Sequence, residues 1–166
     1  MKILLVRHGS AGSANPKAWP DDDLRPLTAK GRKQFGKAAR GLRALGLKPM
    51  RILTSPAERT RQTAELLAEA LKLKTASMLE APELHHGVPP EKALARLARM
   101  RLPASIALVG HQPWLGEFLS LLIAGDERAQ IGLDKGGACL VEAEALGKGK
   151  GGLVWLLTQE QLASLA

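Results

Sequence analysis

The stretch that decides the fold is MKILLVRHGS, residues 1–10. Its residues 2–6 form a short run of mostly branched apolar side chains, which predicts a buried strand. The strand would end on a charged arginine, a titratable histidine and a glycine, Arg7-His8-Gly9. In open α/β sheets, ligands bind outside the carboxyl ends of the strands, so Arg7 and His8 become candidate functional residues.

The rest of the chain alternates expected strands with expected helices. Further strands are expected at 50–54, 74–79 and 105–109, and helices at 28–45, 55–71, 91–102 and 113–122. Two more strands, 138–145 and 153–158, flank a glycine-rich turn and should pair as an antiparallel hairpin. This order predicts an α/β fold with three α/β/α layers and a mainly parallel sheet, in a single domain over residues 1–166.

Two of the expected helices have recognisable starts. Thr28 is typical of an N-cap. In Ser55-Pro56-Ala57-Glu58, we expect Ser55 to be the N-cap, Pro56 the first helical residue and Glu58 the partner that closes a capping box.

The composition of the chain indicates which kinds of partner and which cellular compartment to expect. The chain has 24 lysines and arginines against 16 aspartates and glutamates, a formal net charge of +8, which favours anionic partners. No aromatic residues are interleaved with a basic run, so a nucleic-acid-binding domain is only a remote alternative, and we expect no nucleic-acid partner. The single cysteine, Cys139, excludes an internal disulfide and is compatible with the cytoplasm. No apolar stretch approaches the length of a membrane span, so we expect a cytoplasmic protein with no membrane partner.

Two histidines occupy the same expected setting. His8 follows the first strand and His111 follows the strand at 105–109, and each adjoins a glycine. Arg59 lies one turn into the helix that follows another strand. Helix N-termini and guanidinium groups both bind oxyanions. Arg7, His8, Arg59 and His111 at one sheet edge therefore predict a site for a tetrahedral dianion such as phosphate or sulfate.

A metal site is the alternative for the four histidines, His8, His85, His86 and His111. His85 and His86 are adjacent instead of four residues apart on a helix, and no cysteine cluster assists them. The glycine-rich run 147–152 lacks the order of a phosphate-binding P-loop and fits a hairpin turn better. We expect no metal and no cofactor.

At these residues a family resemblance emerges. Arg7-His8-Gly9 resembles the RHG signature of the histidine phosphatase superfamily, and residues 55–64, SPAERTRQTA, resemble its SPxxRxxQTA motif. Residues 110–113, GHQP, resemble its GHxP motif, and 25–32, RPLTAKGR, match a segment common between the first two motifs. The compact length and the form RHGSA are most similar to the SixA-type phosphohistidine phosphatases.

The resemblance implies a phosphoglycerate-mutase-like fold and a covalent mechanism. His8 would attack phosphorus and carry the phosphoryl group, Arg7 and Arg59 would clamp its oxygens, and His111 would complete the pocket. The implied substrate is phosphohistidine in a histidine-containing phosphotransfer protein, and the alternative is a small phosphate ester such as a sugar or nucleotide phosphate. Mutases of the superfamily carry an asparagine where this chain has Ala14, which speaks against mutase activity.

The resemblance leaves the proton donor for the leaving group open. Glu83, in the stretch ELHHG, is similar to the E-x-x-x-G segment that supplies the acid in the wider family. Asp22, in the expected loop at residues 10–26 (the first loop), is the alternative acid. A third possibility is that there is no donor, because the nitrogen of a phosphohistidine leaving group can already carry a proton.

Overall fold

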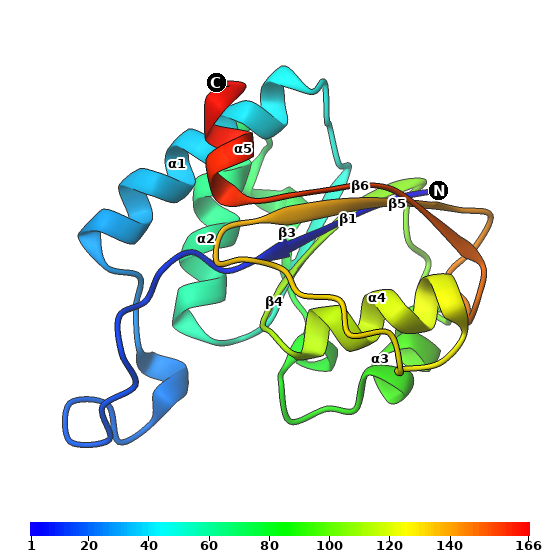
Figure 1. Cartoon of the computed structure of the whole chain (residues 1–166), viewed down its shortest axis with the longest axis horizontal. Coiled ribbons are helices and arrows are strands. Elements are labelled where there is room, and N and C mark those ends of the chain that lie inside the picture. The colour runs from blue at the N-terminus through cyan, green and yellow to red at the C-terminus, as the bar shows by residue number, and fades with distance from the viewer.

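The structure is a computed structural model that describes residues 1–166 apart from the side chain of Thr75. In this description a sheet of six strands lies between helices on its two faces (Figure 1). The strands are β1 (Lys2–Arg7), β2 (Arg51–Thr54), β3 (Met78–Glu80), β4 (Ser105–Gly110), β5 (Ala138–Ala143) and β6 (Gly151–Leu157). The helices are α1 (Ala29–Ala44), α2 (Glu58–Ala70), α3 (Pro90–Leu97), α4 (Trp114–Ala124) and α5 (Gln159–Ser164), with 3-10 turns η1 (Asp22–Leu24), η2 (Thr75–Ser77) and η3 (Pro82–Leu84).

The strand order, β3-β2-β4-β1-β5-β6, confirms the expected α/β class. Strands β1, β2, β3 and β4 run parallel, β5 runs antiparallel to β1, and β5 and β6 form the expected antiparallel hairpin. In the register of β1 and β4, Arg7 lies opposite Gly110. The parallel strands therefore end at one edge, and the residues after β1 and β4 are neighbours there.

Side chains of β1 alternate between two apolar layers, as a strand buried on both faces requires. Ile3 and Leu5 pack in the core that contains α3 and α4, whereas Leu4 and Val6 pack in the core that contains α1, α2 and α5. Figure 1 shows these helix groups on opposite sides of the sheet. The three expected layers are thus confirmed. Among the described residues no helix has both the length and the apolar character needed to cross a membrane.

Several expected boundaries differ from the structure. The capping box at Ser55 is wrong: α2 begins at Glu58, its N-cap is Ala57, and no side chain caps it. Residues 75–77 form turn η2, so the strand expected at 74–79 is shorter and begins at Met78. Helix α3 ends at Leu97 instead of 102, where the last turn tightens and Met100 N donates to Leu97 O. Thr28 does cap α1, with its hydroxyl accepting from Gly31 N.

Two glycines of α1 provide a matched stability test of how this helix packs. A Cβ on Gly31 would lie 2.0 Å from the carbonyl oxygen of Ser10 in the first loop, whereas a Cβ on Gly36 would meet nothing within 4 Å. We expect Gly31→Ala to lower the free energy of unfolding by about 1–3 kcal/mol, because the backbone of the loop must shift. Gly36→Ala should raise it by about 0.5–1 kcal/mol through helix propensity.

Urea denaturation of both variants checks this expectation. Equal effects of the two substitutions would contradict the close packing of α1 on the first loop.

Candidate active site

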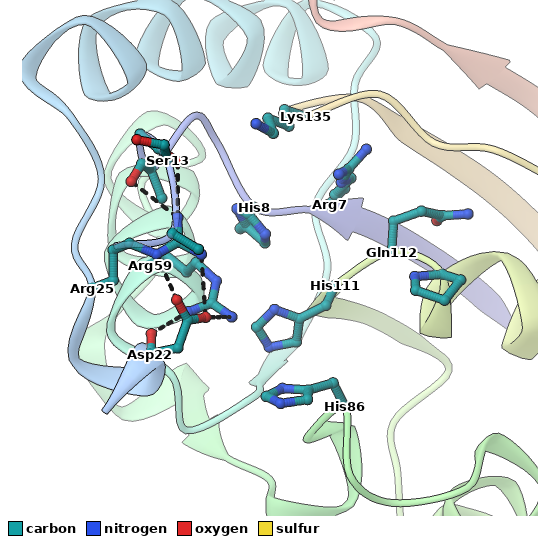
Figure 2. A pocket seen from close by; sticks show the side chains of 14 residues that line it. Arg7, His8, Ser13, Asp22, Arg25, Arg59, His86, His111, Gln112 and Lys135 are labelled. Atoms are coloured by element: carbon teal, nitrogen blue, oxygen red, sulfur yellow. Dashed lines mark hydrogen bonds and ion pairs between the residues drawn. The ribbon is translucent and has the colours of Figure 1, made fainter. Parts of the chain in front are cut away.

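The candidate site is a cleft of about 550 Å³ at the edge where β1 and β4 end. Its walls come from the residues after β1, the first loop and η1, the start of α2, the turn before α3 and the residues after β4. Figure 2 shows Arg7, His8, Arg59 and His111 around this cleft. The structure therefore brings together the four residues that the sequence placed at one sheet edge.

His8 lies at the base of the cleft and is only 7% exposed. Its backbone N–H donates to Gly110 O, and its Nδ1 lies 2.7 Å from Gly9 O. A carbonyl oxygen only accepts hydrogen bonds, so Nδ1 carries the proton and Nε2 keeps its lone pair. Burial, with the positive charges of Arg59, Arg7 and Arg25, lowers the pKa of His8 from 6.5 to about 4. At neutral pH His8 is thus an uncharged imidazole with a free nucleophilic nitrogen.

The protonation of His8 can be measured directly by NMR. We expect the ring of His8 to titrate near pH 4, below its ordinary 6.5, because burial and the arginines disfavour the imidazolium. The unfolded chain binds this proton at higher pH than the folded chain does. The free energy of unfolding should therefore fall as the pH drops from about 6.5 towards 4.

The assignment of the signal rests on its absence from His8→Asn. A midpoint near 6.5 would contradict a buried neutral nucleophile.

Two arginines, Arg7 and Arg59, lie beside His8, and each has an N–H group without a hydrogen-bond partner among the described residues. Arg7 donates from Nη1 to Leu133 O at 2.7 Å, and Arg59 donates from Nη1 to Asp22 O at 2.7 Å. The Nε of each arginine is buried and has no partner among the described residues. Burial lowers the pKa of both guanidiniums, while Asp134 opposes this at Arg7 and Asp22 opposes it at Arg59. Guanidiniums titrate so far above neutrality that both stay charged.

His111 faces His8 across the cleft, with ring centroids 5.3 Å apart. Its Nε2 lies 2.9 Å from Ser55 Oγ, and its buried Nδ1 has no partner in the described part of the chain. Burial, followed by the charges of Arg59 and His8, lowers the pKa of His111 to about 2. Ser55, expected to cap α2, instead holds this ring.

The two candidate proton donors lie in different settings. Asp22 lines the cleft, where it pairs with Arg25 Nε at 2.8 Å and with Arg59 Nη2 at 3.2 Å. The hydrogen bond from Arg25 holds the pKa of Asp22 below its ordinary value, so this carboxylate is ionised at neutral pH. Glu83 lies in η3 and is absent from the described lining of the cleft.

Three side chains beside the cleft, Asp23, His85 and His86, are close enough to be considered as metal ligands. His85 Nε2 lies 2.8 Å from Asp23 Oδ2, and His85 Nδ1 accepts from Gly87 N–H. The proton of His85 is therefore on Nε2, the atom that faces Asp23. The contacts fit a hydrogen bond that joins η1 to the turn after η3 better than they fit a metal site.

Two residues of the SPxxRxxQTA motif, residues 55–64, connect the site to distant segments through hydrogen bonds. Thr63 Oγ1 accepts from Gly9 N at 3.1 Å and donates to Arg59 O at 2.7 Å. Gln62 Oε1 accepts from Leu27 N in the segment before α1. The first turns of α2, the helix that carries Arg59, are thus tied to the loop that carries His8 and to the segment before α1.

Among the residues that line the cleft and were not predicted as phosphate-binding or catalytic, three have basic side chains, namely Arg25, His86 and Lys135. Arg25 binds Asp22 and donates to the carbonyls of Ala11 and Gly12, so it orders the first loop. Its place in the RPLT segment was a usable signal. His86 and Lys135 reach the cleft from loops. No motif or spacing in the sequence predicts that these two residues line it.

A buried, neutral histidine between two arginines at the edge of an α/β sheet is a setting suited to binding an oxyanion. The model of the histidine phosphatase superfamily (branch 1) matches residues 3–93, and the chain belongs to this superfamily.

Relatives in sequence agree with this membership. An uncharacterized protein of Picosynechococcus sp. is 37% identical over 143 residues, which are 82% of this chain and 82% of that protein. A probable phosphoglycerate mutase GpmB of Yersinia enterocolitica is 36% identical over 89 residues. That match covers 53% of this chain and only 40% of the GpmB protein.

Solved structures show the same fold. The protein histidine phosphatase SixA complexed with tungstate has a TM-score of 0.83 at 24% identity, covering 98% of this chain and 99% of that chain. The alpha-ribazole phosphatase from Shigella flexneri has a TM-score of 0.71 at 19% identity, covering 96% of this chain and 97% of that chain. Both likenesses concern the fold, which is SixA-like and mutase-like in architecture.

Proposed function

We propose that this protein is a phosphohistidine phosphatase that removes the phosphoryl group from a histidine-containing phosphotransfer protein through phospho-His8. The observation that carries the proposal is the set of buried nitrogens without partners around His8, namely Arg7 Nε, Arg59 Nε and His111 Nδ1. Buried polar atoms are normally satisfied, and a bound phosphoryl group would supply acceptors to both Nε–H groups. It would also accept from His111 Nδ1–H in the tautomer whose Nε2 accepts from Ser55 Oγ. The SixA structure that shares this fold was solved with tungstate, a tetrahedral oxyanion.

The proposed reaction has two displacement steps at phosphorus. In the first, the Nε2 lone pair of His8 forms a bond to phosphorus while the phosphorus–nitrogen bond of the substrate breaks and its electron pair stays on the leaving imidazole. In the second, a water oxygen forms a bond to phosphorus while the bond between phosphorus and His8 Nε2 breaks and its electron pair returns to Nε2. The proton that the water loses passes to solvent, and inorganic phosphate leaves. Arg7 and Arg59 balance the charge of the equatorial oxygens in both steps.

The ionisation of Asp22 and the position of Glu83 favour a substrate whose leaving group is a nitrogen. An alcohol leaves well only with a proton donor, whereas the imidazole of phosphohistidine can leave already protonated on its other nitrogen. Asp22 is held ionised by Arg25 and Arg59, and Glu83 lies outside the described lining of the cleft. For an ester substrate, Glu83 and Asp22 remain our candidate donors.

Hydrolysis of a small phosphate ester is the second candidate function. It is favoured by the sequence match to GpmB, a probable phosphoglycerate mutase, over 53% of this chain. The fold likeness to the alpha-ribazole phosphatase from Shigella flexneri is compatible with it.

A substrate panel tests the two candidates. The probes are a histidine phosphotransfer domain phosphorylated with phosphoramidate, 3-phosphoglycerate, a nucleoside monophosphate and p-nitrophenyl phosphate. We expect kcat/KM for the phosphoprotein to exceed that for each ester by at least tenfold. A higher kcat/KM for one of the esters would replace our proposal with the second candidate.

A further inference from the structure

The positive charge of the chain is concentrated in one segment. Residues 24–57 contain nine of the 24 lysines and arginines and none of the 16 carboxylates. The rest of the chain has 15 cations against 16 carboxylates and is therefore close to neutral. The net charge of +8 is thus a property of this segment, which comprises α1 and its flanking loops.

Helix α1 carries most of these cations on its solvent face. Phe35, Ala38 and Leu42 turn the opposite face into the core. All six cations of the helix are exposed, and none has an ion pair among the described residues; they are Lys30, Arg32, Lys33, Lys37, Arg40 and Arg43. Lys33, Lys37 and Arg40 lie at i, i+4 and i+7 and form the centre of this face, since such spacing places side chains in one row.

The charged face begins beside the catalytic cleft. Thr28 N donates to Ser10 O, and Gly31 packs on the same carbonyl, so the first turn of α1 rests on the loop that follows His8. From Lys30 to Arg40 the helix rises by about 15 Å. In Figure 1, α1 runs along one side of the sheet away from the first loop. A large partner with its phosphoryl group in the cleft could therefore reach this face.

We propose that the solvent face of α1, centred on Lys33, Lys37 and Arg40, docks an acidic surface of the phosphoprotein substrate. The inference rests on the proposed function and names the chemistry of its partner. Charge complementarity carries it: unpaired cations of one sign next to a cleft attract an acidic surface and speed encounter.

A protein partner fits this face better than a single-stranded nucleic acid or a membrane does. Single-stranded nucleic acids are bound by aromatic platforms, and the aromatic residue of α1, Phe35, is buried. Helices that lie on membranes insert a face of large apolar residues, and the cationic face of α1 carries none in the described structure.

The test compares two triple charge reversals with the same change in net charge. K33E/K37E/R40E alters the face of α1, and K92E/R96E/R99E alters exposed positions in and after α3 on the other side of the sheet. The probes are the phosphorylated phosphotransfer domain, chosen with an acidic surface, and p-nitrophenyl phosphate. We expect the α1 variant to lose roughly 10- to 100-fold in kcat/KM for the phosphoprotein at low salt. The α3 variant should lose much less.

Two further measurements, the dependence on NaCl and the hydrolysis of p-nitrophenyl phosphate, distinguish an effect on docking from an effect on catalysis. The loss in the α1 variant should shrink as NaCl is raised, because screening weakens the attraction in the wild type. Both variants should hydrolyse p-nitrophenyl phosphate at the wild-type rate, which also shows that they fold. If the reversed helix does not fold, K33Q/K37Q/R40Q against K92Q/R96Q/R99Q gives the same comparison.

Several results would overturn the docking face. One is an equal loss in both variants, and another is no loss in the α1 variant. A third is binding of RNA or of phosphatidylserine vesicles that the α1 variant alone abolishes, with kcat/KM for the phosphoprotein unchanged. A wild-type protein that hydrolyses the ester but not the phosphoprotein would overturn the proposed function as well as the docking face.

Discussion

Replacement of His8 by asparagine is expected to lower turnover by roughly 10⁴- to 10⁶-fold, the range seen when a nucleophile is removed. Asparagine can still donate a hydrogen bond towards Gly9 O, as His8 Nδ1 does, but it has no nucleophilic nitrogen. Wild-type protein incubated with a phosphodonor and quenched in alkali should carry phosphate that acid releases. His8→Asn should carry none.

A second histidine serves as the control for this labelling. His85 binds Asp23 and is absent from the described lining of the cleft, so His85→Gln should still take up phosphate. Acid-labile phosphate on His8→Asn, or turnover close to that of the wild type, would rule out the covalent mechanism.

Substitution of Arg59 by alanine is expected to lower kcat/KM by roughly 10³- to 10⁵-fold, as for single arginines in other phosphoryl-transfer enzymes. Two effects add. The guanidinium no longer balances charge on the phosphoryl oxygens, and Asp22 loses one of its two arginine partners while it still faces the cleft. Arg59→Lys should recover only part of the activity, because an ammonium lacks the planar fork.

A double variant separates these two effects. Arg59→Ala/Asp22→Asn should be more active than Arg59→Ala, because it also removes the negative charge of Asp22, which Arg25 alone would then balance. Arg128→Ala is the matched control, since Arg128 is exposed and pairs with Asp126 away from the cleft. Steady-state kinetics with one substrate check all four variants. Activity of Arg59→Ala within tenfold of the wild type would contradict a role in binding the phosphoryl group.

Local patterns were sufficient to predict the layers of the fold. The apolar run at 2–6 and the Thr28 cap are short-range signals, and both are present in the structure. The grouping of His8 with His111 followed from one rule, that parallel strands end at the same edge. The catalytic roles of these residues remain predictions.

Other features depend on contacts between distant segments, which a single sequence does not display. Ser55 looked like a helix cap, yet its hydroxyl lies against His111, 56 residues further along the chain. The pair of Asp22 with Arg59 is also long-range and changes what Asp22 can do. Helix α5 was not expected, because only Leu162 of its six residues is buried and a period cannot be read from one position.

The hydroxyl of Thr63 has a consequence for the interpretation of related sequences. It accepts from Gly9 and donates to Arg59, so one oxygen sets the spacing between the nucleophile loop and the arginine helix. Valine would occupy the same buried position, but it can neither accept nor donate a hydrogen bond, so the buried N–H of Gly9 would lose its partner. A protein that arose by duplication of this gene and has valine at this position should keep the fold. In that protein His8 and Arg59 would no longer be held in their relative positions. Such a copy would be a pseudoenzyme that still displays every histidine and arginine of the active form.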